Sequence, residues 1–584
     1  MLVLNACGGG RPEELPASSR ADSPPFELLE ADMQAVHEAL AGERLLEDGS
    51  TLNCTALVEM YIQRIFAYDK TPQPSGGLAI RGVLYINPHA LEAAAELDAL
   101  YARDGGIGER PLHCMPVLLK DNYDTYDHPS SSGSYAMLGH QAGIDAHSVV
   151  GLRAAGAVIL GKANQDEFAF FTTGFSARAI QVMNPYNTSE SPAGSSSGTG
   201  ASIASNFALG GTGSDTCQSI RHPSSVNGLV GIRPSLGVIS QHGIFPLSHS
   251  RDTGGPMTRT VRDAALMLGA MAGVDPRDRK TLDFPATARP SDYTQFLDRS
   301  RYGVAGRHLG LVRQIGSNTS PWGTGAQAEL IEAAAAKLAE MGAHIHEVYL
   351  PDFANVGAGS RHFDMNDYFK VFEAEGGHSP RHCVSSLFAT EANGRGACTG
   401  VDGILETLRV GARTAALFAL VAADDPDRAP SVAQREYVTR RMDALVDADG
   451  LPVLDADGHQ VRLDALLLSP GPTGGRTCDF GSTTQMGSIV VPVGFDDSVG
   501  VPRGMEIFVR RFDEGTGLGI AYDYEQATQH RRPPDIVPSP LASPESIASF
   551  NAAAQQALMT AGSAAPEDLP LETYIQALRD LTGL

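Results

Sequence analysis

Apolar residues in the first hundred positions recur at helical spacing. The pattern runs over residues 28–46 and 56–68 and continues in the alanine-rich segment 91–101. Residues three and four apart lie on one face of a helix, so this spacing predicts amphipathic helices. We therefore expect the folded part of the chain to begin with a helical layer near Phe26.

Further along, short continuous apolar runs predict buried strands. Residues 116–119 and 157–160 are such runs, and residues 149–155 between them have helical spacing. A strand, a helix and a second strand in succession favour parallel pairing in an α/β sheet. Later segments with the same patterns are a helix at 326–341 and strands at 466–470 and 489–493.

Two Asp-Ala-Asp-Gly turns begin at Asp447 and Asp455 and flank residues 451–454. They predict a short hairpin segment. The ligand spacing of an EF-hand calcium loop is missing from them.

Composition narrows the function classes. Hydrophobic residues make up 42% and charged residues 19%, which is typical of a soluble globular protein, and no run approaches the roughly 20 apolar residues of a spanning helix. Acidic residues outnumber basic ones 68 to 44, giving a net charge of −24, which disfavours nucleic acid as a partner. Seven cysteines include no C-x-x-C pair, and His37-Glu38 is followed by Ala41 where H-E-x-x-H needs histidine. We expect neither a metal nor a cofactor.

The chain begins with a tail, residues 1–25, whose Gly-, Pro- and Ser-rich composition predicts disorder. Within it, Leu-Asn-Ala-Cys at 4–7 resembles the lipobox of bacterial lipoproteins, although six residues before Cys7 are too few for a signal peptide. Two hypotheses stay open. Either the encoded start lies upstream and Cys7 anchors an exported protein to lipid, or this is a short tail on a cytoplasmic protein.

The most informative residues are two dense Gly/Ser loops. Ser-Pro-Ala-Gly-Ser-Ser-Ser-Gly-Thr-Gly occupies 191–200, and Gly-Gly-Thr-Gly-Ser-Asp-Thr-Cys-Gln-Ser-Ile-Arg-His-Pro occupies 210–223. Glycine lets backbone N–H groups approach a ligand, and such groups beside a nucleophile form an oxyanion hole. The serines supply a nucleophile and a proton relay.

Lys120 is one of only six lysines and directly follows the apolar run 116–119. Burial disfavours the charged form of an amine, so a lysine in this position is a candidate general base.

Together these pieces resemble the amidase signature family. The resemblance covers residues 26–534 and includes Pro-Leu-His-Cys-Met-Pro-Val-Leu-Leu-Lys-Asp-Asn at 111–122, Leu-Gly-Lys-Ala-Asn-Gln-Asp-Glu-Phe at 160–168 and Asp-Thr-Gly-Gly-Pro-Met-Thr-Arg-Thr at 252–260. Segments 492–495, 504–508 and 521–528 fit the family's closing pattern. Bacterial peptide amidases are the members that the sequence resembles most.

The resemblance implies a fold and a domain plan. The fold class is α/β, a single α/β/α domain around a large mixed sheet with helices on both faces. The domain spans 26–534, with its signature region at about 185–260 and a substrate-pocket insertion at about 350–440. Residues 535–584 form a C-terminal extension, with a helix expected at 571–581, that could cap the sheet or support a dimer, so monomer and homodimer both stay open.

The resemblance also implies residue roles for an amidase with a Ser–cisSer–Lys triad. Ser219 is the nucleophile, Ser195 the bridging serine after a cis peptide bond, and Lys120 the base. Asp215 and Arg221 form a structural charge pair. The expected oxyanion hole consists of the backbone N–H groups of Thr216, Cys217, Gln218 and Ser219.

One departure from the family stands out. Cys217-Gln218 replaces the usual Gly-Gly before the nucleophile, so we expect these side chains to narrow or polarise the pocket. A nucleophilic role for Cys217 is disfavoured. Lys162, His222, His242 and His249 are interpreted as structural residues rather than ligands.

Two alternatives remain. Gly-Ser-Ser-Ser-Gly at 194–198 fits the G-x-S-x-G elbow of a serine esterase, which would make Ser196 the nucleophile, but the preceding residues look like a loop rather than a strand. The chain could also be an inactive binding protein with the same fold. The expected substrate is a small-molecule amide, and the residues Phe363, Met365, Tyr368, Phe369 and Phe372 suggest an aryl or apolar acyl group.

Overall fold

The computed structural model describes residues 24–70, 79–323, 325–354, 361–379, 432–471 and 477–536. The tail with Cys7, most of the insertion at 350–440 and nearly all of the extension after 534, including its expected helix, lie outside the described residues.

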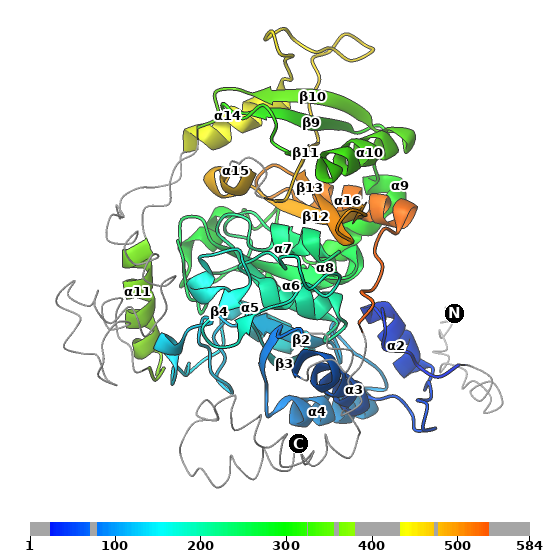
Figure 1. The fold of residues 1–584 in the computed structure, drawn as a ribbon, viewed down its shortest axis with the longest axis vertical. Helices are drawn as coiled ribbons and strands as arrows, with labels where there is room; N and C mark the ends of the chain where they lie inside the picture. The colour runs from blue at the N-terminus through cyan, green and yellow to red at the C-terminus, as the bar shows by residue number, and fades with distance from the viewer. Residues whose placement is uncertain are drawn as a thin grey trace, which may run out of the picture.

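A large mixed sheet of 11 strands forms the centre of the molecule, so the fold class expected from the resemblance is confirmed (Figure 1). The strand order is β1-β3-β2-β6-β8-β7-β12-β13-β11-β9-β10. The strands are β1 (Val83–Ile86), β2 (Pro116–Lys120), β3 (Val158–Ala163), β6 (Gly210–Asp215), β7 (Val230–Arg233), β8 (Thr253–Thr258), β9 (His308–Ile315), β10 (His344–Leu350), β11 (Ala465–Leu468), β12 (Ser488–Asp496) and β13 (Val501–Phe508). A separate two-stranded sheet pairs β4 (Phe175–Ser176) with β5 (Ile180–Gln181).

Parallel pairs occur where the sequence predicts them. β2 pairs in parallel with both β3 and β6, and β9 pairs in parallel with β10 and β11. β12 and β13 form an antiparallel hairpin between these two groups. Every residue of β2, β3, β6, β7, β8 and β11 is buried, which is typical of strands covered on both faces.

Helices pack along the sheet, and Figure 1 shows α2, α3 and α4 together at the end that carries β2 and β3. The α-helices are α2 (Met33–Ala41), α3 (Cys54–Ile65), α4 (Ala90–Asp104), α5 (His147–Ala154), α6 (Ser197–Ala204), α7 (Arg221–Val226), α8 (Val261–Met271), α9 (Arg299–Tyr302), α10 (Ala326–Glu340), α11 (Arg361–Ala374), α14 (Val432–Asp443), α15 (Thr477–Thr484) and α16 (Glu514–Thr528). No helix in the described part of the chain is long and apolar enough to cross a bilayer.

The first predicted helix is shorter than its apolar pattern. The pattern covers 28–46, whereas α2 begins at Met33, because the Asp32 side chain accepts a hydrogen bond from the Ala35 N–H and caps the helix there. At the other end the helix stops before Gly42, and Leu45 forms a bridge with Thr51 instead. The prediction at 56–68 is closer: α3 ends at Ile65 and continues as a π-helical turn, Phe66–Lys70.

The turns at Asp447 and Asp455 close two short hairpins, as the sequence predicts. Val446 bridges Pro452, and Leu454 bridges Gln460. Each first aspartate also accepts backbone hydrogen bonds across its own turn.

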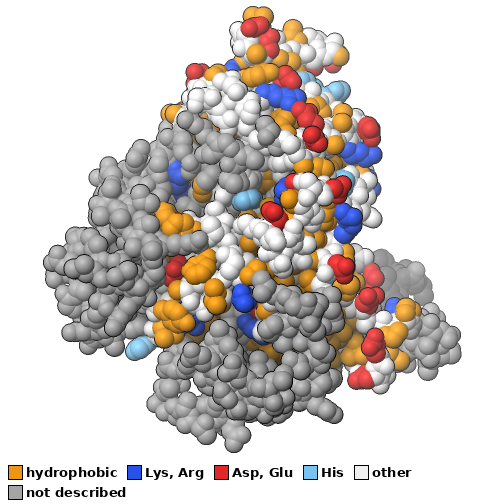
Figure 2. All heavy atoms as spheres, viewed as in Figure 1, with side chains coloured by type: hydrophobic (Ala, Val, Ile, Leu, Met, Phe, Trp, Pro, Cys, Tyr) orange, Lys and Arg blue, Asp and Glu red, His pale blue; other side chains and the backbone are white. Residues whose placement is uncertain are grey.

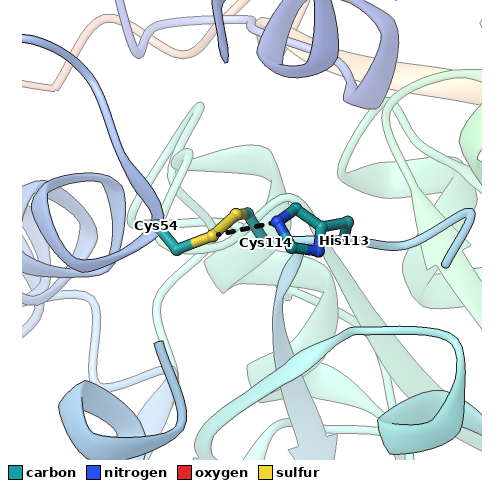
Figure 3. Close-up of side chains that lie close together, drawn as sticks. All are labelled: Cys54, His113 and Cys114. Carbon is teal, nitrogen blue, oxygen red and sulfur yellow. Dashed lines mark hydrogen bonds between the residues drawn. A yellow bond between two sulfur atoms is a disulfide. The ribbon is translucent and has the colours of Figure 1, made fainter. Parts of the chain in front are cut away.

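A disulfide between Cys54 and Cys114 ties the first residue of α3 to the segment that leads into β2 (Figure 3). Their Cα atoms lie 5.1 Å apart, within the usual range for a disulfide, and both residues are buried. The His113 Nε2 lies 3.5 Å from the Cys54 sulfur, and burial is the main cause that lowers the His113 pKa to about 4. Sequence spacing alone does not pair these two cysteines.

Candidate active site

Lys120 is the last residue of β2, and its amine lies against serine hydroxyls. The Nζ atom donates hydrogen bonds to Ser195 Oγ at 2.7 Å, to Ser214 Oγ at 2.9 Å and to the Ser214 carbonyl at 3.2 Å. Because β2 and β6 are parallel neighbours, the end of β2 meets the end of β6, where Ser214 lies. The strand thus delivers the amine to both Gly/Ser loops.

The environment of Lys120 favours its neutral form. The side chain is completely buried, and this burial lowers its pKa from the ordinary value to about 7. Asp166, Asp215 and Asp252 oppose the shift, because their negative charges favour the ammonium ion. The balance leaves an amine that gains and loses a proton near neutral pH.

The loop that carries Ser195 is held from the neighbouring segment 164–174. The Gly194–Ser195 peptide bond is cis, and the Ser195 carbonyl accepts a hydrogen bond from the Asp166 N–H at 3.1 Å. A side chain at position 194 would overlap the Asp166 carboxylate, which explains the glycine there. That carboxylate is itself fixed by the backbone N–H groups of Thr173 and Gly174.

Ser219 lies between the end of β6 and the start of α7, and it is 4% exposed. The Ser196 N–H donates to the Ser219 carbonyl at 3.2 Å, so the two Gly/Ser loops are in direct contact. Among the described residues, the backbone N–H groups of Gln218 and Ser219 donate to no protein acceptor. The buried Gln218 Oε1 likewise has no protein partner among those residues.

A buried quartet of charges braces the Ser219 loop. Asp215 pairs with Arg221 at 3.1 Å and with Arg233 at 3.2 Å, and Arg221 also pairs with Glu506 at 3.0 Å. Asp215 in addition accepts a hydrogen bond from the Ile220 N–H. Two negative and two positive groups compensate one another, and the pKa of Asp215 is lowered although its burial acts in the opposite direction.

Sequence reasoning finds the Asp215 and Arg221 pair but misses other residues of this neighbourhood. Asn122 donates to Ser214 Oγ at 3.1 Å, and the Asp252 carboxylate accepts from Thr216 Oγ1 at 2.5 Å. Both lie inside segments that resemble the family, but nothing in the spacing says that they face Ser214 and Thr216. Burial raises the pKa of Asp252 to about 6.

Lys162 and the three histidines take part in other contacts. The Lys162 amine donates to the Tyr123 carbonyl and, at 3.3 Å, to Ser130 Oγ. His242 Nε2 lies 2.8 Å from a Glu375 carboxylate oxygen, and the His249 N–H donates to Asp364. The His222 Nδ1 is buried with no protein partner in the described part of the chain, and burial lowers the pKa of this imidazole to about 4.

The structure weakens the two rival nucleophiles. Residues 191–195 form no strand, and Ser196 stands directly before α6, so the strand that a nucleophile elbow needs is missing there. The Ser196 hydroxyl lies near the backbone of Ser214. Cys217 is disulfide-bonded and therefore offers no thiolate beside Ser219.

Comparisons with known proteins define the class. A family model described as amidase matches residues 56–370. A probable amidase of Arabidopsis thaliana is 30% identical and covers 88% of this chain and 93% of its own length. One component of the glutamyl-tRNA(Gln) amidotransferase of Nitratidesulfovibrio vulgaris is also 30% identical, with 84% and 95% covered. The native peptide amidase of Stenotrophomonas maltophilia superposes with a TM-score of 0.70 at 33% identity, covering 87% of this chain and 99% of that one.

The chain therefore belongs to the amidase family, as the sequence resemblance indicated. Its likeness extends to peptide amidase in both sequence and fold. Membership in this family supports an enzyme that hydrolyses amide bonds of small-molecule substrates.

Proposed function

We propose that this protein hydrolyses carboxamides through an acyl-enzyme on Ser219, with Ser195 and Lys120 as a proton relay. The single observation that carries the proposal is the buried amine of Lys120, placed 2.7 Å from Ser195 Oγ with its pKa lowered to about 7. A neutral amine at hydrogen-bond distance from a hydroxyl has the geometry and the proton affinity of a general base.

The proposed chemistry has two halves. Lys120 takes the proton of Ser195 Oγ as Ser195 takes that of Ser219, and the Ser219 oxygen attacks the carbonyl carbon. The tetrahedral intermediate collapses, the relay returns a proton to the departing amine, and an ester to Ser219 remains. Water then loses a proton to the same relay, attacks the ester and releases the acid and the free serine.

The developing oxyanion needs hydrogen-bond donors at the start of the Ser219 loop. The backbone N–H groups of Gln218 and Ser219, which donate to no acceptor among the described residues, support this role, and we assign the neighbouring N–H groups of Thr216 and Cys217 to the same hole. Removing one such donor in other hydrolases costs roughly 3 to 4 kcal/mol of transition-state stabilisation. Asp215 and Arg221 hold the loop and carry no proton in this scheme.

An apolar acyl group is the proposed substrate feature. Met365, Tyr368, Phe369 and Phe372 of α11 pack with Phe168, Phe245 and Leu247 in one buried cluster. This cluster adjoins the base, because Phe245 exchanges backbone and side-chain hydrogen bonds with Asn122, two residues after Lys120. We propose amides with aryl or apolar acyl groups, including C-terminal amides of peptides, rather than internal peptide bonds.

Ammonia release from a panel of amides tests the proposal. Purified protein should release ammonia from C-terminally amidated peptides, and Ser219→Ala should abolish this release. Ser196→Ala is the matched control, a neighbouring buried serine that the mechanism does not use, and it should retain most activity. Loss of activity in Ser196→Ala with retention in Ser219→Ala would establish the elbow mechanism instead, and inactivity on every amide and ester would favour the binding-protein alternative.

A further inference from the structure

Three histidines gather on one face of the outermost pair of strands, at the opposite edge of the sheet from β2 and β3. His308 begins β9, and His344 and His346 lie on β10. The parallel register pairs His344 with His308 and His346 with Gly310. Directly paired residues in a ladder share a face, as do residues two apart in one strand, so all three imidazoles lie on the same face.

The three rings are close enough to act together. His308 Nδ1 and His346 Nε2 lie 2.9 Å apart, and the ring centroids of His308 and His344 lie 4.8 Å apart. Burial and the two neighbouring histidines lower the His346 pKa, which keeps its imidazole neutral and its lone pair free at physiological pH. His344 is exposed, so its ring has room to turn toward the other two.

A second group of ligand atoms lies beside the first. The ligand atoms of Asp455, Asp457 and His459, on the second hairpin turn, lie within 4.8 Å of one another. The Asp455 pKa is lowered mainly by the His459 backbone N–H, and the charge of His308 contributes, which places the hairpin near the histidines. A groove of about 240 Å³ adjoins them, lined in part by His346, Glu347, Asp447 and Asp449.

The surroundings carry the charge that a cation needs. On the face shown in Figure 2, acidic side chains gather at the end of the molecule where the hairpins project. Arginine neutralises only part of this charge: Arg313 pairs with Glu347, and Arg307 pairs with Asp464. Neutral imidazoles next to carboxylates form the donor set that Zn²⁺ and similar divalent transition metals prefer.

We propose that His308, His344 and His346, with a carboxylate or imidazole from the hairpin at 455–459, bind one divalent transition-metal ion, with Zn²⁺ as the first candidate. The site is remote in strand order from Lys120, so the metal takes no part in the amidase chemistry. It would instead join the exposed edge strand β10 to the hairpin beside it. The other sulfur and histidine group, Cys54, Cys114 and His113, does not compete, because its two sulfurs are bonded to each other.

Zinc binding to the full-length, tag-free, metal-stripped protein tests this site. Titration calorimetry should give one Zn²⁺ per chain, and His308→Ala or His346→Ala should weaken binding by at least about tenfold. His89→Ala is the matched control, since His89 is an exposed histidine paired with Glu92 away from this edge, and it should leave the affinity unchanged. Equal affinity in all four proteins, or no binding by the unsubstituted protein, would overturn the proposal.

A second measurement covers a variant that fails to fold. In the unsubstituted protein, saturating Zn²⁺ should protect His308 and His346 from diethylpyrocarbonate, as read by peptide mass spectrometry, and should leave His89 as reactive as before. Equal modification of these histidines with and without Zn²⁺ would contradict the site. Amidase activity should be the same in metal-free and zinc-loaded protein.

Discussion

Two buried lysines on neighbouring parallel strands show what separates a base from a structural cation. Lys120 ends β2 and Lys162 lies on β3, both side chains are fully buried, and burial lowers their pKa values to about 7 and about 8. The Lys120 amine donates to the Ser195 hydroxyl, whose loop contacts that of Ser219. The Lys162 amine instead donates to the Tyr123 carbonyl and to Ser130.

The difference teaches that burial alone does not create a catalytic base. Burial makes an amine easier to deprotonate at both sites, but a backbone carbonyl has no proton to give. A base needs an acidic hydrogen-bond partner that leads on to a nucleophile. The nearby carboxylates act alike at the two sites, because Asp121 and Asp124 oppose the shift of Lys162 as Asp166 and Asp215 oppose that of Lys120.

The largest expected effect comes from exchanging each lysine for alanine. Lys120→Ala should lower kcat/KM for an amide by about 10⁴-fold, because the relay loses its base. Lys162→Ala should change kcat/KM by less than about tenfold but lower the free energy of unfolding by about 1 to 3 kcal/mol, because buried acceptors lose their donor. Steady-state kinetics and urea unfolding measure the two quantities. A loss of chemistry in Lys162→Ala as large as that in Lys120→Ala would break the comparison.

Next in size is the effect of the disulfide that tethers the segment before β2. The Cys54–Cys114 bond closes a loop of 60 residues, so replacing both cysteines with serine should lower the free energy of unfolding by roughly 4 kcal/mol. The pH dependence of activity should keep its midpoint, since Lys120 retains its burial. Mass spectrometry without reduction checks the bond itself. An oxidised pair would support the export hypothesis, because disulfides persist mainly in oxidising compartments, whereas free thiols in native protein would contradict the pairing.

The pH dependence should separate Lys120 from other groups that titrate nearby. Only the neutral amine accepts a proton, so kcat/KM should rise about tenfold per pH unit below about 7 and level off above it. Asp252, with its pKa raised to about 6, could produce a similar curve at slightly lower pH. Asp252→Asn should therefore keep the midpoint near 7, and Lys120→Arg should be inactive at every pH because arginine does not deprotonate. A midpoint that disappears in Asp252→Asn would assign the titration to Asp252.

The smallest expected effect concerns selectivity. Gln218 projects a side chain where the family usually has glycine, and its Oε1 is buried. Gln218→Gly should shift the ratio of kcat/KM between bulky and small acyl amides, within about tenfold, because one methylene of pocket space is worth a factor of ten or more. Competition between two amides in one reaction measures this ratio directly. An unchanged ratio would show that Gln218 does not shape the pocket.

Much of the sheet could be predicted from local patterns. The apolar runs at 116–119 and 157–160 became β2 and β3, and the helical spacing at 326–341 became α10. These predictions succeed because fully buried strands and amphipathic helices leave a periodic signal in the sequence. The first helix was too long by the same reasoning, since an apolar pattern does not show that Asp32 caps the helix and Gly42 ends it.

The candidate site was predictable only in part. The Gly/Ser loops and Lys120 stand out locally, and the family resemblance adds their roles. Contacts between distant segments leave no such signal: Glu506 reaches Arg221 across 285 positions, and Cys54 meets Cys114 only because α3 packs beside the segment before β2. Such pairs depend on tertiary packing, which one sequence does not reveal.

Covalent labelling tests the central claim most directly. A fluorophosphonate probe reacts with an activated serine, and peptide mass spectrometry identifies the residue. We predict labelling at Ser219 in the unsubstituted protein and in Lys162→Ala, and its near-complete loss in Lys120→Ala. Labelling at Ser196, or equal labelling of Ser219 with and without Lys120, would contradict the proposed relay.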